Sequence, residues 1–182
     1  MRLECIIEPG QEPVTLEEVK AYLRIDDDSE DVLLQALIKT AREYCENYQH
    51  VAYYSRTMRL TLPPGEWGDV FELPRTKFGC TVEKVSSVDL QGAIKEVDQT
   101  CLFTILGNIN TELAVTDDTP YSNTLVVEYV AGCLDDPPES IKTAIKLLVS
   151  GWYENRLPTS DKANNVVPYG VHALLNPGRV VA

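Results

Sequence analysis

Residues 14–48 read VTLEEVKAYLRIDDDSEDVLLQALIKTAREYCENY, and this stretch decides the fold class of the chain. Thr15 and Glu18 form a T-x-x-E capping box, which predicts that a short helix of about two turns begins here. From Leu34 to Tyr48, apolar residues recur every three or four positions, which predicts a longer helix with one buried face. The chain therefore opens with two helices that are built to pack.

The polar residues of this stretch have two roles. The acidic run 26–31 separates the two helices, and we interpret it as capping, because carboxylates accept hydrogen bonds from the unpaired amides of a helix start. A calcium site is the alternative, but Asp31 stands where an EF-hand loop needs glycine. On the polar face of the second helix we expect two exposed i,i+4 ion pairs, Lys39 with Glu43 and Arg42 with Glu46.

A second helical block lies near the end of the chain. Residues 137–156, PPESIKTAIKLLVSGWYENR, carry an apolar stripe at helical spacing, and the two prolines stand where missing amides cost little. Asp136 is the expected N-cap. The tail 169–179, YGVHALLNPGR, predicts a further short turn of helix over residues 171–175.

The middle of the chain has a sequence pattern typical of strands and not of helices. Between residues 53 and 131, runs rich in β-branched and aromatic residues are separated by turn signals such as Gln91-Gly92. We expect strands at residues 53–62, 70–73, 81–90, 101–106, 112–115 and 124–131. Strands this short and closely spaced are typical of a small antiparallel sandwich or barrel-like module.

Together these elements predict an α+β fold, in which N- and C-terminal helices form one helical core and the antiparallel β module is inserted between them. We expect residues 1–50 to form the N-terminal part of the core, with residues 1–13 as a loose or edge-pairing arm. Residues 51–135 then form the β module, and residues 136–182 the C-terminal helix and tail.

The charge of the chain argues against a protein that grips nucleic acid. The formal net charge is −12, and it is uneven: −7 over residues 1–50, −6 over residues 51–135 and +1 over residues 136–182. An acidic surface repels phosphate backbones. The C-terminal part is the segment that an acidic partner repels least.

The sequence offers little material for catalysis or metal binding. There are two histidines, and the five cysteines are dispersed without a C-x-x-C motif, so we expect reduced thiols in a cytoplasm-like compartment. Motifs for metalloproteases, serine hydrolases and nucleotide-binding loops are absent, and so is a secretory leader or a membrane-spanning run. We therefore expect no catalytic, cofactor or metal site.

Several segments resemble the head–tail connector (adaptor) proteins of tailed bacteriophages and prophages. They are the two opening helices, L-P-R at 73–75 with V-x-K-V-S-S-V-D-L-Q-G at 82–92, the block 137–156, and G-V-H-A-L-L-N-P-G-R at 170–179. Each segment alone is weakly specific, but their order along nearly the whole chain is more specific. The resemblance indicates the longer form of the family, with a β-rich insertion.

The resemblance implies a structural role without catalysis. The chain is expected to form a ring of about a dozen copies beneath the portal protein, which extends the DNA channel toward a tail-side completion or stopper protein. DNA would pass through without specific binding, and an acidic first half lining the channel would let it slide. The implied location is the head–tail interface of the virion, after assembly in the host cytoplasm.

Two sets of residues are candidates for the contacts of such a ring. The tail supplies the expected portal-binding residues, by analogy with the family: Tyr169, Val171, His172, Leu174, Leu175 and Arg179. The aromatic and arginine residues near the end of the preceding helix are candidates for the subunit interface, because such residues dominate interface hot spots: Trp152, Tyr153 and Arg156. The alternative is a small protein- or ligand-binding module with a β insertion, outside any virion, and an enzyme is the remaining class.

Overall fold

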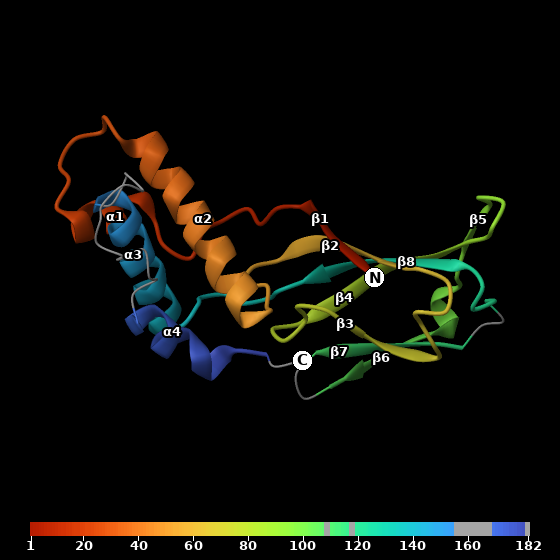
Figure 1. The fold of residues 1–182 in the computed structure, drawn as a ribbon. Helices are drawn as coiled ribbons and strands as arrows, with labels where there is room; N and C mark the ends of the chain where they lie inside the picture. Colours follow the sequence, from red (N-terminus) through yellow and green to blue (C-terminus); the bar gives the residue numbers. More distant parts are fainter. Residues whose placement is uncertain (108–109, 117–118, 155–168, 181–182) are drawn as a thin grey trace, which may run out of the picture. The chain divides into compact units, whose positions relative to one another are not determined.

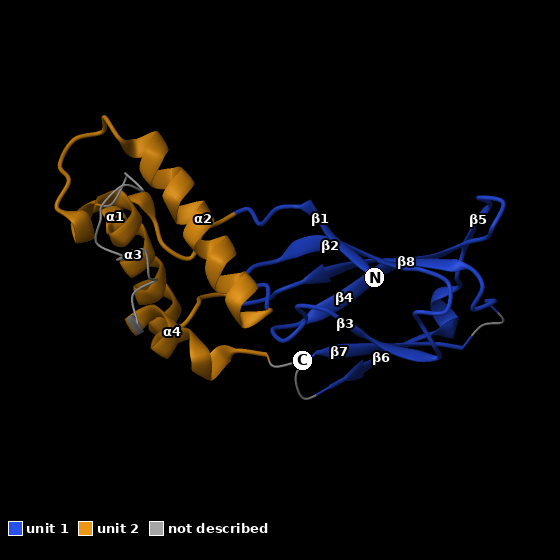
Figure 2. Ribbon diagram, viewed as in Figure 1, with its two compact units in different colours: residues 1–10, 51–134 blue, residues 11–50, 135–182 orange. Residues whose placement is uncertain are grey.

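The computed structural model describes residues 1–107, 110–116, 119–154 and 169–180. The chain divides into two compact units, shown in Figure 2. The strand unit consists of Met1–Gly10 and Val51–Leu134, and the helical unit of Gln11–His50 and Asp135–Ala182. The first ten residues, which the sequence grouped with the first helices, lie in the strand unit because they form its first strand.

The strand unit contains a five-stranded antiparallel sheet in the order β1-β2-β8-β4-β5 (Figure 1). Its strands are β1 (Arg2–Ile7), β2 (Arg56–Leu62), β8 (Thr124–Ala131), β4 (Cys80–Val88) and β5 (Ile94–Glu96). β8 lies in the middle, and every residue of β2 from Arg56 to Leu62 pairs with it. Strict alternation of buried and half-buried residues along β2 and β8 gives this sheet one face toward the core.

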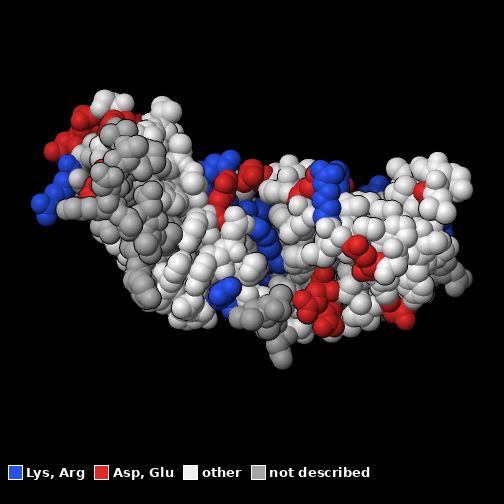
Figure 3. Space-filling view, in the orientation of Figure 1, with Lys and Arg blue, Asp and Glu red and all other residues white. Residues whose placement is uncertain are grey.

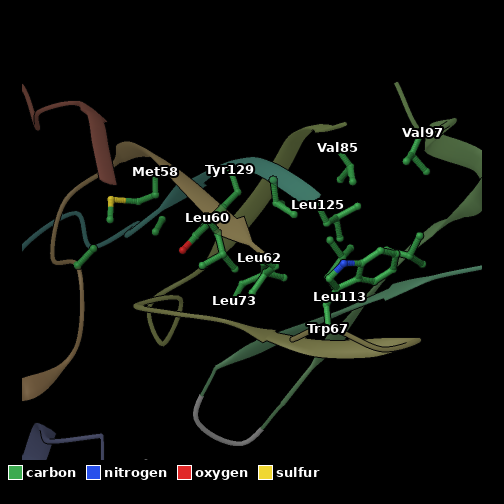
Figure 4. Close-up of a cluster of buried hydrophobic side chains, with 14 residues drawn as sticks. Met58, Leu60, Leu62, Trp67, Leu73, Val85, Val97, Leu113, Leu125 and Tyr129 are labelled. Atoms are coloured by element: carbon green, nitrogen blue, oxygen red, sulfur yellow. The ribbon is translucent and has the colours of Figure 1, made fainter. Parts of the chain in front are cut away.

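A second sheet of three strands has the order β3-β7-β6. It consists of β3 (Val70–Leu73), β7 (Thr111–Val115) and β6 (Leu102–Leu106), which follows the short 3₁₀ turn η1 (Gln99–Cys101). Thr111, Leu113 and Val115 of the central strand β7 are buried. The two sheets share one core, to which the five-stranded sheet contributes Leu60, Val85, Leu125 and Tyr129, and the three-stranded sheet Leu73 and Leu113 (Figure 4). The expected antiparallel β module is therefore a two-sheet sandwich.

The observed strands lie where the sequence placed them, with one addition. β3 and β8 have the expected bounds, and β4, β6 and β7 differ by one or two residues at an end. The expected strand over 53–62 begins later, at Arg56. β5 is a strand that the sequence did not predict, because three exposed residues carry no periodic signal.

The helical unit contains α1 (Leu16–Leu23), α2 (Asp31–Gln49), α3 (Glu139–Glu154) and α4 (Tyr169–Leu175), followed by the turn η2 (Asn176–Gly178). The capping box of α1 is confirmed: Glu18 N donates to Thr15 Oγ1, and Thr15 N donates to Glu18 Oε2. The apolar stripes of α2 and α3 face each other, with Leu34, Ile38, Ile145 and Leu148 at most 3% exposed. The α+β class with a helical core is thus confirmed.

The acidic run before α2 does not cap that helix. Glu30, the N-cap residue, makes no side-chain cap hydrogen bond. Instead, Lys20 Nζ binds the carboxylates of Asp28 and Asp31, and Asp27 accepts hydrogen bonds from the backbone and hydroxyl of Ser29. The run therefore ties the α1–α2 connection to α1. The hydrogen-bonding part of the capping interpretation is wrong, because Lys20 binds Asp28 and Asp31 and the Glu30 carboxylate accepts from Tyr153. Asp31 does lie in the first turn of α2, where its charge suits the helix dipole.

The ion pair between Arg42 and Glu46 is buried, not exposed. Arg42 is 1% exposed and Glu46 0%, and Arg42 Nη1 lies 2.8 Å from Glu46 Oε2. Arg42 Nε also donates to Glu12 Oε2 at 2.8 Å. Burial opposes the charge of Arg42, but the two carboxylates hold its pKa above the usual range. The other expected pair, Lys39 with Glu43, is exposed as predicted.

Candidate functional site

The C-terminal tail binds to the side of α2 that carries Tyr44 and Tyr48. These residues stand one helical turn apart, with their rings stacked at a centroid distance of 6.5 Å. The His172 ring of α4 stacks on Tyr48 at 4.7 Å, and His172 Nε2 lies 3.0 Å from Tyr44 Oη. The Arg179 guanidinium lies over the Tyr48 ring at 5.0 Å.

Hydrogen bonds hold the tail against the C-terminal end of α2. Tyr48 Oη donates to Asn176 Oδ1 at 2.7 Å, and Gln49 Nε2 donates to the Leu175 carbonyl at 2.6 Å. The Val180 amide donates to the carbonyl of Gln49 at 2.9 Å. The buried Gln49 therefore satisfies the backbone of the tail, which positions the residues after α4.

The structure separates the predicted portal-binding residues into two groups. Val171 and Leu175 are fully buried in the helical unit, so both stabilise its fold. His172 and Leu174 are half-buried and Arg179 is exposed, so these three offer surface to a partner. Tyr169 begins α4, and its side chain lies outside the described residues.

The predicted subunit-interface residues lie close to the tail. Trp152 of α3 packs edge-on against Tyr44, at a centroid distance of 6.3 Å and an interplanar angle of 83°. The hydroxyl of Tyr153 donates to the Glu30 carboxylate. Both aromatic residues are half-buried, and Arg156 lies outside the described residues. Tyr44 thus joins the two predicted sets, since it contacts both Trp152 and His172.

We call Tyr44, Tyr48, Trp152, His172 and Arg179 the tail-docking cluster. The sequence did not single out Tyr44 or Tyr48 as functional residues. Two tyrosines at i,i+4 beside an apolar stripe are a helix-packing signal, and nothing local shows that their partners come from the tail. Each stacked or cation–π pair contributes about 0.5–1.5 kcal/mol, so together they hold the tail against α2.

The described residues show no arrangement for metal chemistry. Among residues 1–107, 110–116, 119–154 and 169–180, no three His, Cys, Asp or Glu side chains are grouped so that they could hold a metal ion. Within the same ranges, no helix is long and apolar enough to cross a membrane. Within the run 26–31, Lys20 binds the carboxylates of Asp28 and Asp31, Ser29 donates to Asp27, and Tyr153 donates to Glu30.

The cysteines of the described chain differ in exposure. Cys5 and Cys133 are exposed, whereas Cys45 of α2 is fully buried, and burial raises the pKa of its thiol to about 12. An unfolded thiol ionises at about pH 8.5. The folded state therefore keeps this proton more tightly, so Cys45 lowers the stability of the fold as the pH rises from about 8.5 toward 12.

We expect iodoacetamide at pH 8 to modify Cys5 and Cys133 rapidly in the native protein and to leave Cys45 unmodified, because only the thiolate reacts. Peptide mass spectrometry after a time course measures each site. Addition of urea is the control and should make Cys45 as reactive as Cys133. Modification of native Cys45 at the rate of Cys133 would contradict the burial.

Comparisons with known proteins found a matching family and similar structures. Residues 13–70 match the family model "Phage gp6-like head-tail connector protein". A protein in the neck of an empty gene transfer agent (GTA) particle, computed with C6 symmetry, has a similar fold at a TM-score of 0.80 and 24% identity. That match covers 100% of this chain and 97% of the other chain.

Two further structures have the same fold. One is in the virion of a native gene transfer agent particle, with a TM-score of 0.80 and 23% identity. The other is in the neck of a native particle computed with C12 symmetry, with a TM-score of 0.69 and 24% identity. Each match covers 100% of this chain and 97% of the other. No curated protein sequence matches the chain.

The resemblance that the sequence indicated is therefore confirmed. The family match includes α1, α2 and β2, and the fold match extends over both units. Residues 13–70 match the phage head–tail connector family, and the whole chain has the fold of the neck proteins described above.

Proposed function

We propose that this chain is a structural head–tail connector that forms a ring of about a dozen copies beneath the portal protein. The ring extends the DNA channel toward a tail-side completion or stopper protein and performs no catalysis. The observation that carries the proposal is the fold match to a neck protein over 100% of this chain. The neck computed with C12 symmetry supports a ring of about this size.

The charge of the chain suits a channel through which DNA slides. On the face drawn in Figure 3, acidic and basic side chains are both scattered among large uncharged areas, but the net charge of the whole chain is −12. Few phosphate-neutralising contacts form on such a surface. We infer that acidic residues of the first half line the channel. A map of the assembled neck with a basic lumen would contradict this.

The portal protein and the tail-side protein are the proposed partners, and the head–tail interface of the virion is the proposed location, reached after assembly in the host cytoplasm. The proposed portal contact is formed by the exposed Arg179 and by the open sides of His172 and Leu174. Because Val171 and Leu175 are buried, deletion of the whole tail would also unfold the helical unit.

A point variant therefore tests the function more cleanly. We expect Arg179→Glu to weaken binding to the purified portal protein at least about tenfold, because it reverses a charge at the proposed contact and removes the cation over Tyr48. Surface plasmon resonance with immobilised portal measures the change. Lys39→Glu is the matched control, since Lys39 is a half-exposed cation on α2 of the same unit.

The two outcomes separate the tail assignment from the function. If the wild type binds the portal and Arg179→Glu binds it equally tightly, the proposed portal contact is contradicted and the connector role stays intact. A wild-type chain that binds no portal, and is missing from the neck in electron micrographs of the particles, would contradict the connector role itself.

A further inference from the structure

The three-stranded sheet of the strand unit ends at an open strand edge. Among the described residues, β6 (Leu102–Leu106) pairs on one side only, with β7. The amide of Thr116 donates to the carbonyl of Cys101 at 3.0 Å, and the register then makes Phe103 and Ile105 the residues that exchange hydrogen bonds with β7. The backbone groups of Thr104, between them, point away from the sheet.

The edge has none of the features by which proteins usually protect such strands. Its sequence, LFTIL, contains no charged residue and no proline, and its pairing with β7 contains no bulge. Its side chains are exposed as well: Phe103 by 54%, Ile105 by 45% and Leu106 by 88%. An uncharged, regular and apolar edge is a template for another strand.

A slot of about 280 Å³ lies beside this edge, between β6 and the first half of β4. Its lining includes Leu102 and Thr104 of β6 and Cys80 and Val82 of β4. Cys80, Val82 and Leu102 are half-buried residues packed on the core of the sandwich. The core is thus open at the position that a fourth strand of the small sheet would cover.

We propose that a strand of a second copy of this chain adds to the open edge of β6 and covers the slot. This inference rests on the proposed ring. The formal net charge of −12 makes copies repel one another, and the contact with the least repulsion is an uncharged strand. The edge strand of one copy therefore fits another copy better than it fits a cationic partner.

The fold also supplies a second edge strand, which has a register shift between Cys5 and Ile7 and whose two charges, Arg2 and Glu4, pair with each other. β1 (Arg2–Ile7) is the first strand in the order β1-β2-β8-β4-β5, at the end of the sheet away from β4 and its slot. Ile6 is 43% and Ile7 60% exposed. A contact from β6 of one copy to β1 of the next uses two different surfaces of the strand unit, and a closed ring requires such head-to-tail contacts.

The test compares two substitutions at one position. Thr104→Pro removes the outward amide and is tolerated at a strand edge, whereas Thr104→Val keeps the amide and the shape of the side chain. We expect Thr104→Pro to weaken self-association at least about tenfold and Thr104→Val to leave it nearly unchanged. Sedimentation velocity over a concentration series measures the association, and circular dichroism checks that each variant is folded.

A second pair of variants serves if Thr104→Pro does not fold. Leu106→Lys places a charge on the edge, and Leu90→Lys places one on an equally exposed residue between β4 and β5. Only the first should weaken self-association. Amide exchange of the wild type adds a measurement without substitution: exchange at Thr104 and within β1 should slow as the protein assembles.

The inference would be overturned if Thr104→Pro associated as strongly as the wild type. It would also be overturned if assembly left amide exchange in β6 and β1 unchanged. A wild type that stays monomeric at the highest concentrations would overturn it too. The connector role is judged separately, by portal binding and by the presence of the chain in the neck, so the inference can fail while that role stands.

Discussion

Replacing Arg42 by alanine is expected to lower the free energy of unfolding of the helical unit by about 3–5 kcal/mol. Arg42 lies at 2.8 Å from both Glu46 and Glu12, and Glu46 is fully buried. Removal of the guanidinium takes away the charge that balances the buried Glu46 carboxylate. Desolvation of that carboxylate, not the loss of attraction alone, makes the effect large.

Urea denaturation followed by the helical circular dichroism signal measures this change. Lys39→Ala is the matched control: Lys39 is on the same helix, its pair with Glu43 is 3.9 Å long, and both side chains are about half exposed. A pair of that kind contributes at most about 1 kcal/mol. The double variant Arg42→Met with Glu46→Met should recover much of the stability, since it removes both charges. A loss for Arg42→Ala no larger than for Lys39→Ala would contradict the burial of the pair.

Replacing Gly132 by alanine is expected to destabilise the strand unit by about 3–5 kcal/mol. Gly132 follows β8 with a φ of +84°, a conformation that residues with a Cβ rarely adopt. An added Cβ would lie 2.5 Å from the carbonyl oxygen of Tyr54 and 3.0 Å from that of Ala52. Because these neighbours are backbone atoms, the chain itself must shift to make room.

Gly65→Ala separates the two causes of this effect. Gly65 also has a positive φ, +75°, but an added Cβ there meets no atom within 4 Å. The control should lose only about 1–2 kcal/mol, from the backbone conformation alone. Urea denaturation in a Trp152→Phe background, in which Trp67 of the strand unit is the remaining tryptophan, measures both variants by fluorescence. If both variants lost the same free energy of unfolding, the close approach to Tyr54 would contribute nothing to the destabilisation by Gly132→Ala.

The sequence predicted those features that depend on neighbours along the chain. The capping box of Thr15 and Glu18 involves residues three apart, and its bonds formed as expected. The run of β-branched and aromatic residues over 124–131 predicted the bounds of β8, because strand propensity is a local property. The candidate site was found only in part: the tail and Trp152 were singled out, whereas Tyr44, Tyr48 and Gln49 were not.

Tertiary structure decided what depends on distant neighbours. Arg42 and Glu46 carry the charges of a solvated helix face, and only packing against the rest of the helical unit buries them. Tyr44 and His172 stand 128 positions apart, so no local pattern relates them. The same holds for the open edge of β6, because its exposure depends on which strands of the fold lie beside it. The chain thus encodes its helices and strands locally, whereas burial and free edges follow from long-range packing, which the sequence specifies only through the complete fold.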